Sequence, residues 1–153
     1  MILSKTSQYA IQALIYLATQ APGTLCLSRV VSAQLGVPPA YLSKILQTLC
    51  HHGLVKSCRG KHGGFFLCEA PEKVSLMRVL LLMEGPAFSE SCLLGLKRCS
   101  DETACPMHQR WIPIKQDIIE LLKLQTLASL SDAVLAGKYR ICDIDSCTLC
   151  QPG

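Results

Sequence analysis

Glycine and proline residues divide the first third of this chain into three short helical segments. Residues 6–20 carry apolar side chains at helical spacing, and a shorter segment over residues 29–36 ends at Gly36. Pro38 then opens a third helix, residues 40–53, because proline is well tolerated at a helix start. Two short helices joined by so tight a turn predict a helix-turn-helix.

The third predicted helix has two different faces. Its apolar stripe is expected to pack in the core and consists of Leu42, Ile45, Leu46 and Leu49. The opposite face is small, polar and basic, and consists of Ala40, Tyr41, Ser43, Lys44 and Gln47. Such a surface fits the major groove of DNA, where side chains contact base edges. An ordinary solvated helix has the same composition, so this helix alone leaves both interpretations open.

A glycine-rich hairpin is predicted directly after the third helix. Residues 54–57 and 65–68 have the composition of two short strands. The loop between them contains three glycines and the basic side chains of Arg59, Lys61 and His62. A basic loop of this kind can reach a DNA groove or its phosphates. A helix-turn-helix followed by a basic hairpin therefore predicts a winged helix.

The charge of the chain is unevenly distributed. Residues 1–80 hold eight Lys or Arg against two Asp or Glu, a balance of +6. Residues 81–153 hold seven against nine, a balance of −2. A basic front half suggests a polyanionic partner. Together with the predicted winged helix, it makes double-stranded promoter DNA the expected partner.

A long apolar helix is predicted beyond the winged domain, over residues 108–125. We divide the chain into a DNA-binding domain (1–85), a cysteine-rich loop that is a candidate cluster-binding loop (86–107), two helices (108–137) and a tail (138–153). An isolated apolar helix must be covered, either by other parts of the same chain or by a second copy. Because two-fold DNA sites are matched by two-fold proteins, we expect a homodimer through this helix. The predicted fold class is mostly α: a winged helix-turn-helix with a small β-hairpin wing and a long C-terminal dimerisation helix.

Three cysteines and a histidine lie close together in the predicted loop: Cys92, Cys99, Cys105 and His108, separated by six, five and two residues. Thiolates and imidazole are ligands for zinc and for iron–sulfur clusters. The last two stand at a predicted helix start, where the helix dipole favours thiolates. The wide gaps fit a cluster better than a structural zinc ion. Redox-active thiols without metal are the third alternative.

Seven further cysteines lie outside this group. Cys142, Cys147 and Cys150 have spacings of four and two residues, which resemble part of a plant-type ferredoxin run. They are a possible second metal site, and spare thiols are the alternative. The cysteines of the front half are expected to be packing residues and are Cys26, Cys50, Cys58 and Cys68.

Several classes of protein are disfavoured by the sequence. No apolar run reaches the roughly eighteen residues of a membrane span, and Lys5 and Gln8 interrupt any signal peptide. We therefore expect a cytoplasmic protein with no membrane partner and with reduced thiols. No nucleophile–base pair, phosphate-binding loop or carboxylate pair is recognisable, so an enzyme is not expected.

Four stretches, in this order, resemble the Rrf2 family of bacterial winged-helix regulators: TSQYAIQALIYLA, LGVPPAYLSKILQTLCHHGLV, RGKHGGFFL and the Cys-x₆-Cys-x₅-Cys-x₂-His stretch. The resemblance covers about residues 1–137 and is stronger to the iron–sulfur cluster regulators of the family than to its nitric-oxide-sensing repressors. It implies a dimeric DNA-binding regulator whose cluster state sets promoter binding.

The resemblance also implies roles for individual residues. The cluster thiolates would be Cys92, Cys99 and Cys105. The fourth ligand would be His108, and Arg59 would enter the minor groove. The first cysteine gap is one residue longer than the commonest family spacing, and Gln8 stands where some members have an acidic ligand. Glutamine is a poor iron ligand, which favours His108.

We therefore predict a transcription regulator whose promoter binding is controlled by an iron–sulfur cluster that senses iron, redox state or nitric oxide. A [2Fe–2S] cluster is favoured over a [4Fe–4S] cluster. The alternative is a metal- or cluster-carrying redox or scaffold protein that does not bind DNA. A salt-dependent, sequence-selective gel shift separates the two hypotheses.

Overall fold

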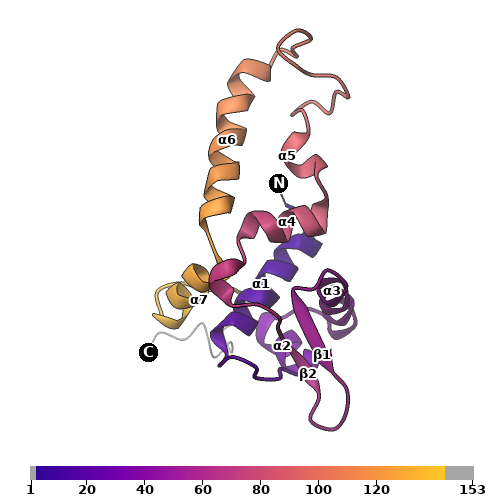
Figure 1. Cartoon of the computed structure of the whole chain (residues 1–153), viewed down its shortest axis with the longest axis vertical. Coiled ribbons are helices and arrows are strands. Elements are labelled where there is room, and N and C mark those ends of the chain that lie inside the picture. Colours follow the sequence, from indigo (N-terminus) through magenta and orange to yellow (C-terminus); the bar gives the residue numbers. More distant parts are fainter. Residues whose placement is uncertain (1–2, 144–153) are drawn as a thin grey trace.

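The computed structural model describes residues 3–143 and shows a winged domain from which one long helix projects (Figure 1). The helices are α1 (Lys5–Thr19), α2 (Ser28–Leu35), α3 (Pro39–His51), the short 3₁₀ helix η1 (Pro71–Lys73), α4 (Leu76–Glu84), α5 (Ala87–Glu90), α6 (His108–Leu124) and α7 (Leu127–Leu135). The strands are β1 (Val55–Cys58) and β2 (Gly64–Leu67). This mostly helical architecture with one hairpin confirms the predicted fold class. Across the described residues, no helix has both the length and the apolar character needed to cross a bilayer.

The first three helices pack around one apolar core. Leu14 of α1, Val31 of α2 and Leu42 of α3 are fully buried in it. Gly36 ends α2 in a left-handed backbone conformation with φ of 67°, and Pro39 begins α3. Glycine reaches that conformation without the steric cost of a Cβ, so the helix stops there. The predicted turn between the two helices is confirmed.

The wing is a two-stranded antiparallel hairpin in which Val55 pairs with Leu67 and Cys58 pairs with Gly64. A third segment joins it, because Cys26 and Phe65 exchange backbone hydrogen bonds of 2.9 and 2.8 Å. At Gly64 a Cβ atom would lie 2.8 Å from the Cys26 carbonyl oxygen, so only glycine fits this close approach. The hairpin is thereby attached to the loop before α2.

The last helix, α7, folds back onto the winged domain and packs against α1. Leu127 and Val134 are buried in the core. Thr126 and Ser129 form a capping box, with backbone-to-hydroxyl hydrogen bonds of 3.2 and 3.1 Å. The sequence analysis placed α6 and α7 together in the segment 108–137. In the structure only α6 of these two helices projects from the winged domain (Figure 1).

The predicted loop 86–107 is not wholly irregular. It begins with a single helical turn, α5, which the sequence analysis did not anticipate. Pro86 precedes this turn in helical backbone conformation, and Ser91 ends it by returning to an extended conformation. This turn connects α4 to the rest of the cysteine-rich loop and determines the direction in which that loop begins.

A carboxylate at the end of α4 holds the start of α1. Glu84 Oε1 accepts hydrogen bonds from the hydroxyl groups of Ser4 and Ser7, both at 2.5 Å, and from the Ser4 backbone N–H at 3.0 Å. The hydroxyl hydrogen bonds, first that of Ser4 and then that of Ser7, hold the pKa of Glu84 below its ordinary value of 4.5. A folded-state pKa below the unfolded one means that ionised Glu84 stabilises the fold.

Replacing Glu84 with glutamine is expected to lower the free energy of unfolding by about 1 kcal/mol at neutral pH. The stabilisation is present above the unfolded pKa and is lost as the pH falls through the folded pKa, so the two proteins should converge in acid. Urea unfolding at neutral and acid pH measures this difference. The control is Glu72→Gln, which changes an exposed carboxylate on η1. Equal stability of Glu84→Gln and the parent at neutral pH would contradict the prediction.

Candidate metal centre and nucleic-acid interface

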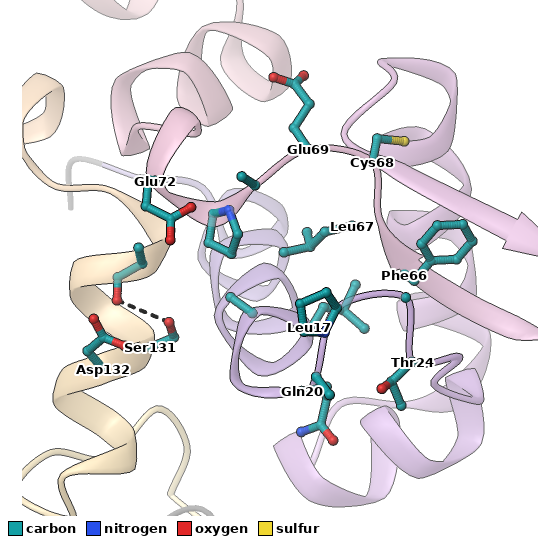
Figure 2. A pocket seen from close by; sticks show the side chains of 17 residues that line it. Leu17, Gln20, Thr24, Phe66, Leu67, Cys68, Glu69, Glu72, Ser131 and Asp132 are labelled. Atoms are coloured by element: carbon teal, nitrogen blue, oxygen red, sulfur yellow. Dashed lines mark hydrogen bonds between the residues drawn. The ribbon is translucent and has the colours of Figure 1, made fainter.

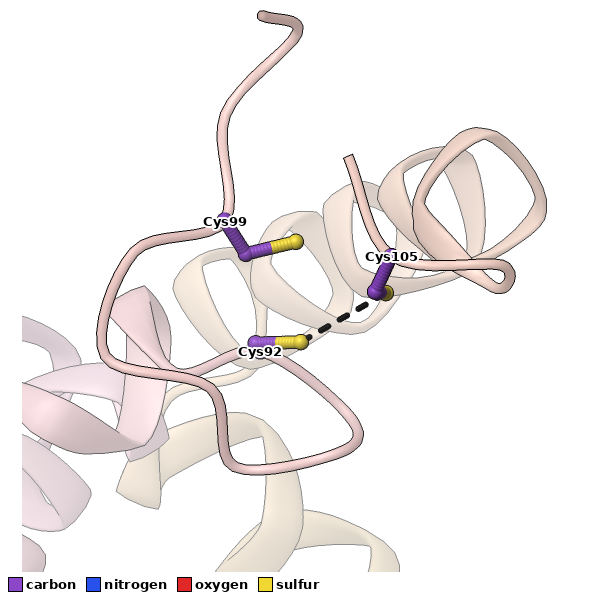
Figure 3. A group of neighbouring side chains, drawn as sticks. All are labelled: Cys92, Cys99 and Cys105. Carbon is purple, nitrogen blue, oxygen red and sulfur yellow. Dashed lines mark hydrogen bonds between the residues drawn. The ribbon is translucent and has the colours of Figure 1, made fainter. Parts of the chain in front are cut away.

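Three thiols converge in the loop between α5 and α6. Cys92 follows α5 directly after its C-cap residue, and Cys105 lies three residues before the first residue of α6. The side chains of Cys92, Cys99 and Cys105 come together in Figure 3, and their sulfur atoms all lie within 4.8 Å of one another. The Cys92 and Cys105 sulfur atoms are 3.6 Å apart. The loop therefore brings together residues that are separated by thirteen positions in the sequence.

The histidine of the same motif lies beside these thiols. His108 is the first residue of α6 and is only 9% exposed. Its Nδ1 lies 3.1 Å from Cys99 Sγ, and its Nε2 lies 3.1 Å from Asp101 Oδ1. A carboxylate on the far nitrogen fixes the orientation of an imidazole ligand. The sequence analysis did not identify Asp101, and its place within the cysteine loop was the only signal for it.

The electrostatic environment differs among the thiols. A hydrogen bond from the Leu94 backbone N–H, which outweighs the effect of burial, helps lower the pKa of Cys92 to about 7. For Cys99, a backbone hydrogen bond from Cys105 lowers the pKa, but burial and the two neighbouring thiols together outweigh it and raise the pKa. The lowered pKa favours the thiolate form of Cys92, which is the form that binds a metal.

One buried donor near this group has no acceptor. Within residues 3–143, Trp111 Nε1 is the only buried side-chain nitrogen or oxygen without a hydrogen-bond partner. Leaving a buried N–H unpaired costs about 1–3 kcal/mol. An acceptor at the thiol site would remove this cost. Three soft sulfur donors, one imidazole and a free N–H together fit an iron–sulfur cluster.

The predicted DNA-reading face of α3 is mostly exposed. Ala40, Lys44 and Gln47 are exposed, and Ser43 is half-buried. Tyr41, the remaining residue of the predicted DNA-reading face, contacts α1. Its hydroxyl lies 2.6 Å from the Thr6 hydroxyl, and its ring packs edge-on against Tyr9 with centroids 5.8 Å apart. Tyr41 therefore fixes α3 against α1.

The tip of the wing is open to solvent. Arg59, Lys61 and His62 are all exposed in the turn between β1 and β2. At Gly63, a Cβ atom would collide with the Cys58 carbonyl oxygen, so the tight turn requires glycine there. Two basic side chains and a histidine are thus held in the hairpin loop. This loop lies at the opposite end of the molecule from the loop between α5 and α6, which contains the thiols (Figure 1).

The remaining cysteines fall into different environments. Cys26 is buried in the core, as expected for a packing residue, and burial raises the pKa of its thiol. Cys58 is exposed, which does not fit the predicted packing role. Cys142 is 7% exposed and belongs to the core. The other two members of the possible second metal site, Cys147 and Cys150, lie outside the described residues.

A separate cavity of about 550 Å³ lies between the end of α1, the segment after β2, and α7 (Figure 2). Glu69, Glu72 and Asp132 line it, and no basic side chain does so among the described residues. Glu69 is paired with Arg78 through hydrogen bonds of 2.9 and 2.6 Å. The acidic lining does not fit a nucleic-acid phosphate, and none of the predicted metal ligands lies there.

A helix-turn-helix with an exposed basic wing, joined by a cysteine-lined loop to a projecting helix, defines a winged-helix DNA-binding regulator. Residues 3–133 match the Rrf2 family, described as iron-dependent transcriptional regulators. This chain belongs to the Rrf2 family. It is thus a DNA-binding regulator of transcription, and the predicted resemblance is confirmed.

Individual relatives agree with this assignment. A protein of Aquifex aeolicus named as an HTH-type transcriptional regulator is 30% identical over 132 residues, which is 85% of this chain and 91% of the relative. The structure of CymR, the global cysteine regulator of B. subtilis, has a TM-score of 0.72 at 25% identity and covers 85% of this chain and 95% of its own. The structure of T. potens IscR has a TM-score of 0.69 at 27% identity, covering 90% and 92%.

Proposed function

We propose that promoter binding by this regulator is controlled by an iron–sulfur cluster held by Cys92, Cys99, Cys105 and His108. The observation that carries the proposal is the convergence of three thiols within 4.8 Å beside a buried imidazole at the start of α6. Similarity to IscR and the sulfur-rich donor set support it. When bound, such a cluster supplies a reversible one-electron change and a sensitivity to iron supply.

The surface that contacts DNA would be formed by two elements. The exposed side chains of Ala40, Lys44 and Gln47 and the half-buried Ser43, all on α3, would enter the major groove. The wing residues Arg59, Lys61 and His62 would contact the phosphate backbone of the DNA or enter its minor groove. Tyr41 would contribute by holding α3 in position, because its hydroxyl is already bonded to Thr6.

A homodimer would form through α6. Ile114 and Leu121 are seven residues apart on this helix and are 51% and 58% exposed. Apolar residues at that spacing form the seam of paired helices. A second copy would cover them, and two winged domains would then match a two-fold DNA site.

The thiol site lies between the two parts that would have to be coupled. Its first ligand, Cys92, follows α5 and α4, and α4 is held to α1 through Glu84. Its last ligand, His108, begins the proposed dimer helix. Closing the loop on a cluster would fix α6 relative to the winged domain. The spacing of the two domains in the dimer would therefore change with cluster occupancy, as a shift between two populations.

The test compares holoprotein, purified without oxygen, with protein stripped by a chelator, in gel shifts against a set of promoter fragments. For at least one fragment the dissociation constant should differ by about tenfold or more, a coupling of about 1.4 kcal/mol. Higher salt should weaken both complexes, because basic residues displace counterions from DNA. If both forms bound every fragment equally, cluster control would be rejected.

Arg59→Ala serves as the internal control for this comparison. It should weaken binding of both forms without changing iron content, because Arg59 lies at the wing tip, far from the thiols (Figure 1). Failure of both forms to bind any fragment would favour the alternative, a cluster carrier without DNA binding. Membership of a family of transcription regulators favours the first outcome.

A further inference from the structure

Trp111 has a buried indole N–H without an acceptor and lies one turn along α6 from His108. We infer that this N–H donates a hydrogen bond to a sulfur atom of the cluster site and thereby raises the reduction potential of the bound cluster. The inference rests on the proposed cluster, and it assigns a role to a residue outside the four-ligand motif. Trp111 acts here as a positioning and tuning residue, since it is not a ligand.

The helix phase places Trp111 on the same side of α6 as His108. Residues three apart are neighbours on a helix surface. The less exposed residues of α6 follow one stripe, and they are His108, Trp111, Lys115, Ile118, Ile119 and Leu122. The exposed Ile114 and Leu121, proposed for the dimer, lie off this stripe. The indole is therefore directed inward, toward the chain that packs against α6.

The direction of helical side chains brings the indole closer to the thiols. In an α-helix the Cα–Cβ bonds tilt toward the N-terminus, and long side chains cover the preceding turn. For Trp111 that preceding turn is the one that begins with His108, whose Nδ1 is 3.1 Å from Cys99 Sγ. The indole of Trp111 is thus directed toward the end of α6 at which the thiol site lies.

The chain opposite α6 leads from the end of that helix to the thiol site. The Leu76 backbone N–H at the start of α4 bonds to the Gln125 carbonyl at 2.9 Å, so α4 begins beside the end of α6. The chain then continues through α4 to α5, which lies beside α6 (Figure 1), and Cys92 follows directly after the C-cap residue of α5. The thiol site therefore lies at the start of α6, where His108 is 3.1 Å from Cys99 Sγ, and Trp111 follows one turn further along the same helix.

Sulfur is the acceptor chemistry that this location offers. Hydrogen bonds to cluster sulfur atoms stabilise the more negative, reduced state and raise the reduction potential. When the cluster is titrated with a chemical reductant, the reductant adds one electron to the iron of the cluster. No bond is broken, and the proton stays on Nε1. The indole contributes only through a stronger hydrogen bond to the more negative sulfur.

The decisive experiment is a redox titration of anaerobically purified holoprotein carrying Trp111→Phe, which keeps an aromatic ring but removes the N–H. The reduction potential of the cluster should become more negative. At a fixed solution potential the ratio of reduced to oxidised cluster should fall about tenfold, which corresponds to a shift of about 59 mV for a one-electron couple. Gln109→Ala is the matched control, because it removes an exposed polar side chain from the same turn, and it should leave the potential unchanged. An unchanged potential in Trp111→Phe would overturn the inference.

A second measurement covers the case in which Trp111→Phe fails to hold the cluster. The chain contains one tryptophan, so the ¹⁵N spectrum of the wild type has one indole N–H signal. On cluster loading, this signal should shift and broaden, and its exchange with deuterium should slow. An indole signal that is the same in apoprotein and holoprotein would overturn the inference. Wild type without iron and acid-labile sulfide would overturn the proposed function itself, a result separate from either indole outcome.

Discussion

Cys92→Ala protein is expected to be colourless after anaerobic purification, with iron and acid-labile sulfide reduced from about one cluster per chain to near zero. A backbone hydrogen bond from Leu94 helps lower the pKa of Cys92 to about 7, which favours the thiolate form that binds iron. Its sulfur lies 3.6 Å from Cys105 Sγ, so its loss removes one corner of the thiol triangle. Three remaining donors that include only two sulfur atoms do not complete a four-ligand cluster site.

The fold should survive this substitution. Cys92 lies in a loop between α5 and α6 and is not part of the apolar core, so the stability of the apoprotein should change by no more than about 0.5 kcal/mol. Visible absorption, iron and sulfide analysis, and thermal unfolding measure the two effects separately. The matched control is Cys58→Ala, which removes an exposed thiol from the wing and should keep the colour. Full cluster content in Cys92→Ala would remove this residue from the ligand set.

Local sequence rules were sufficient for the elements of the winged domain. Gly36 ends α2 and Pro39 begins α3 because each residue restricts the backbone in its own way, independently of distant contacts. The spacing of the cysteines also identified the candidate ligands. Their convergence could be anticipated because Cys105 and His108 flank a helix start, which fixes their separation before the rest of the chain is placed.

Interactions between distant segments could not be predicted in this way. The sequence analysis placed Tyr41 on the face of α3 that was predicted to contact DNA. In the structure its hydroxyl bonds to Thr6, thirty-five positions away. Glu84 bonds to Ser7 across seventy-seven positions. Such pairs depend on how α1 packs against α3 and α4, and helix periodicity contains no information about that packing. The same limit applies to α7, because nothing in its local sequence indicates that it packs against α1.

Leu121→Asp is expected to convert the dimer into a monomer at micromolar concentration. Leu121 is 58% exposed on α6, and covering a leucine contributes about 1.5–3 kcal/mol. A two-fold interface loses this contribution twice, so the dimer dissociation constant should rise by about 10²–10⁴-fold. The introduced carboxylate would add a desolvation cost in the same direction. Sedimentation or light scattering measures the change in mass.

Loss of the dimer should also weaken DNA binding, although Leu121 lies on α6 and contacts neither α3 nor the wing in the proposed complex. A monomer engages one half-site, so it loses the gain in affinity that comes from binding two linked half-sites together. Leu135→Asp is the matched control: it places the same charge on an exposed leucine of α7, and both mass and DNA affinity should stay unchanged. Leu121→Asp that remained a tight dimer with full DNA affinity would show that α6 is not the interface. In that case the coupling of the thiol site to the winged domains would have to run through α4 and Glu84 within one chain.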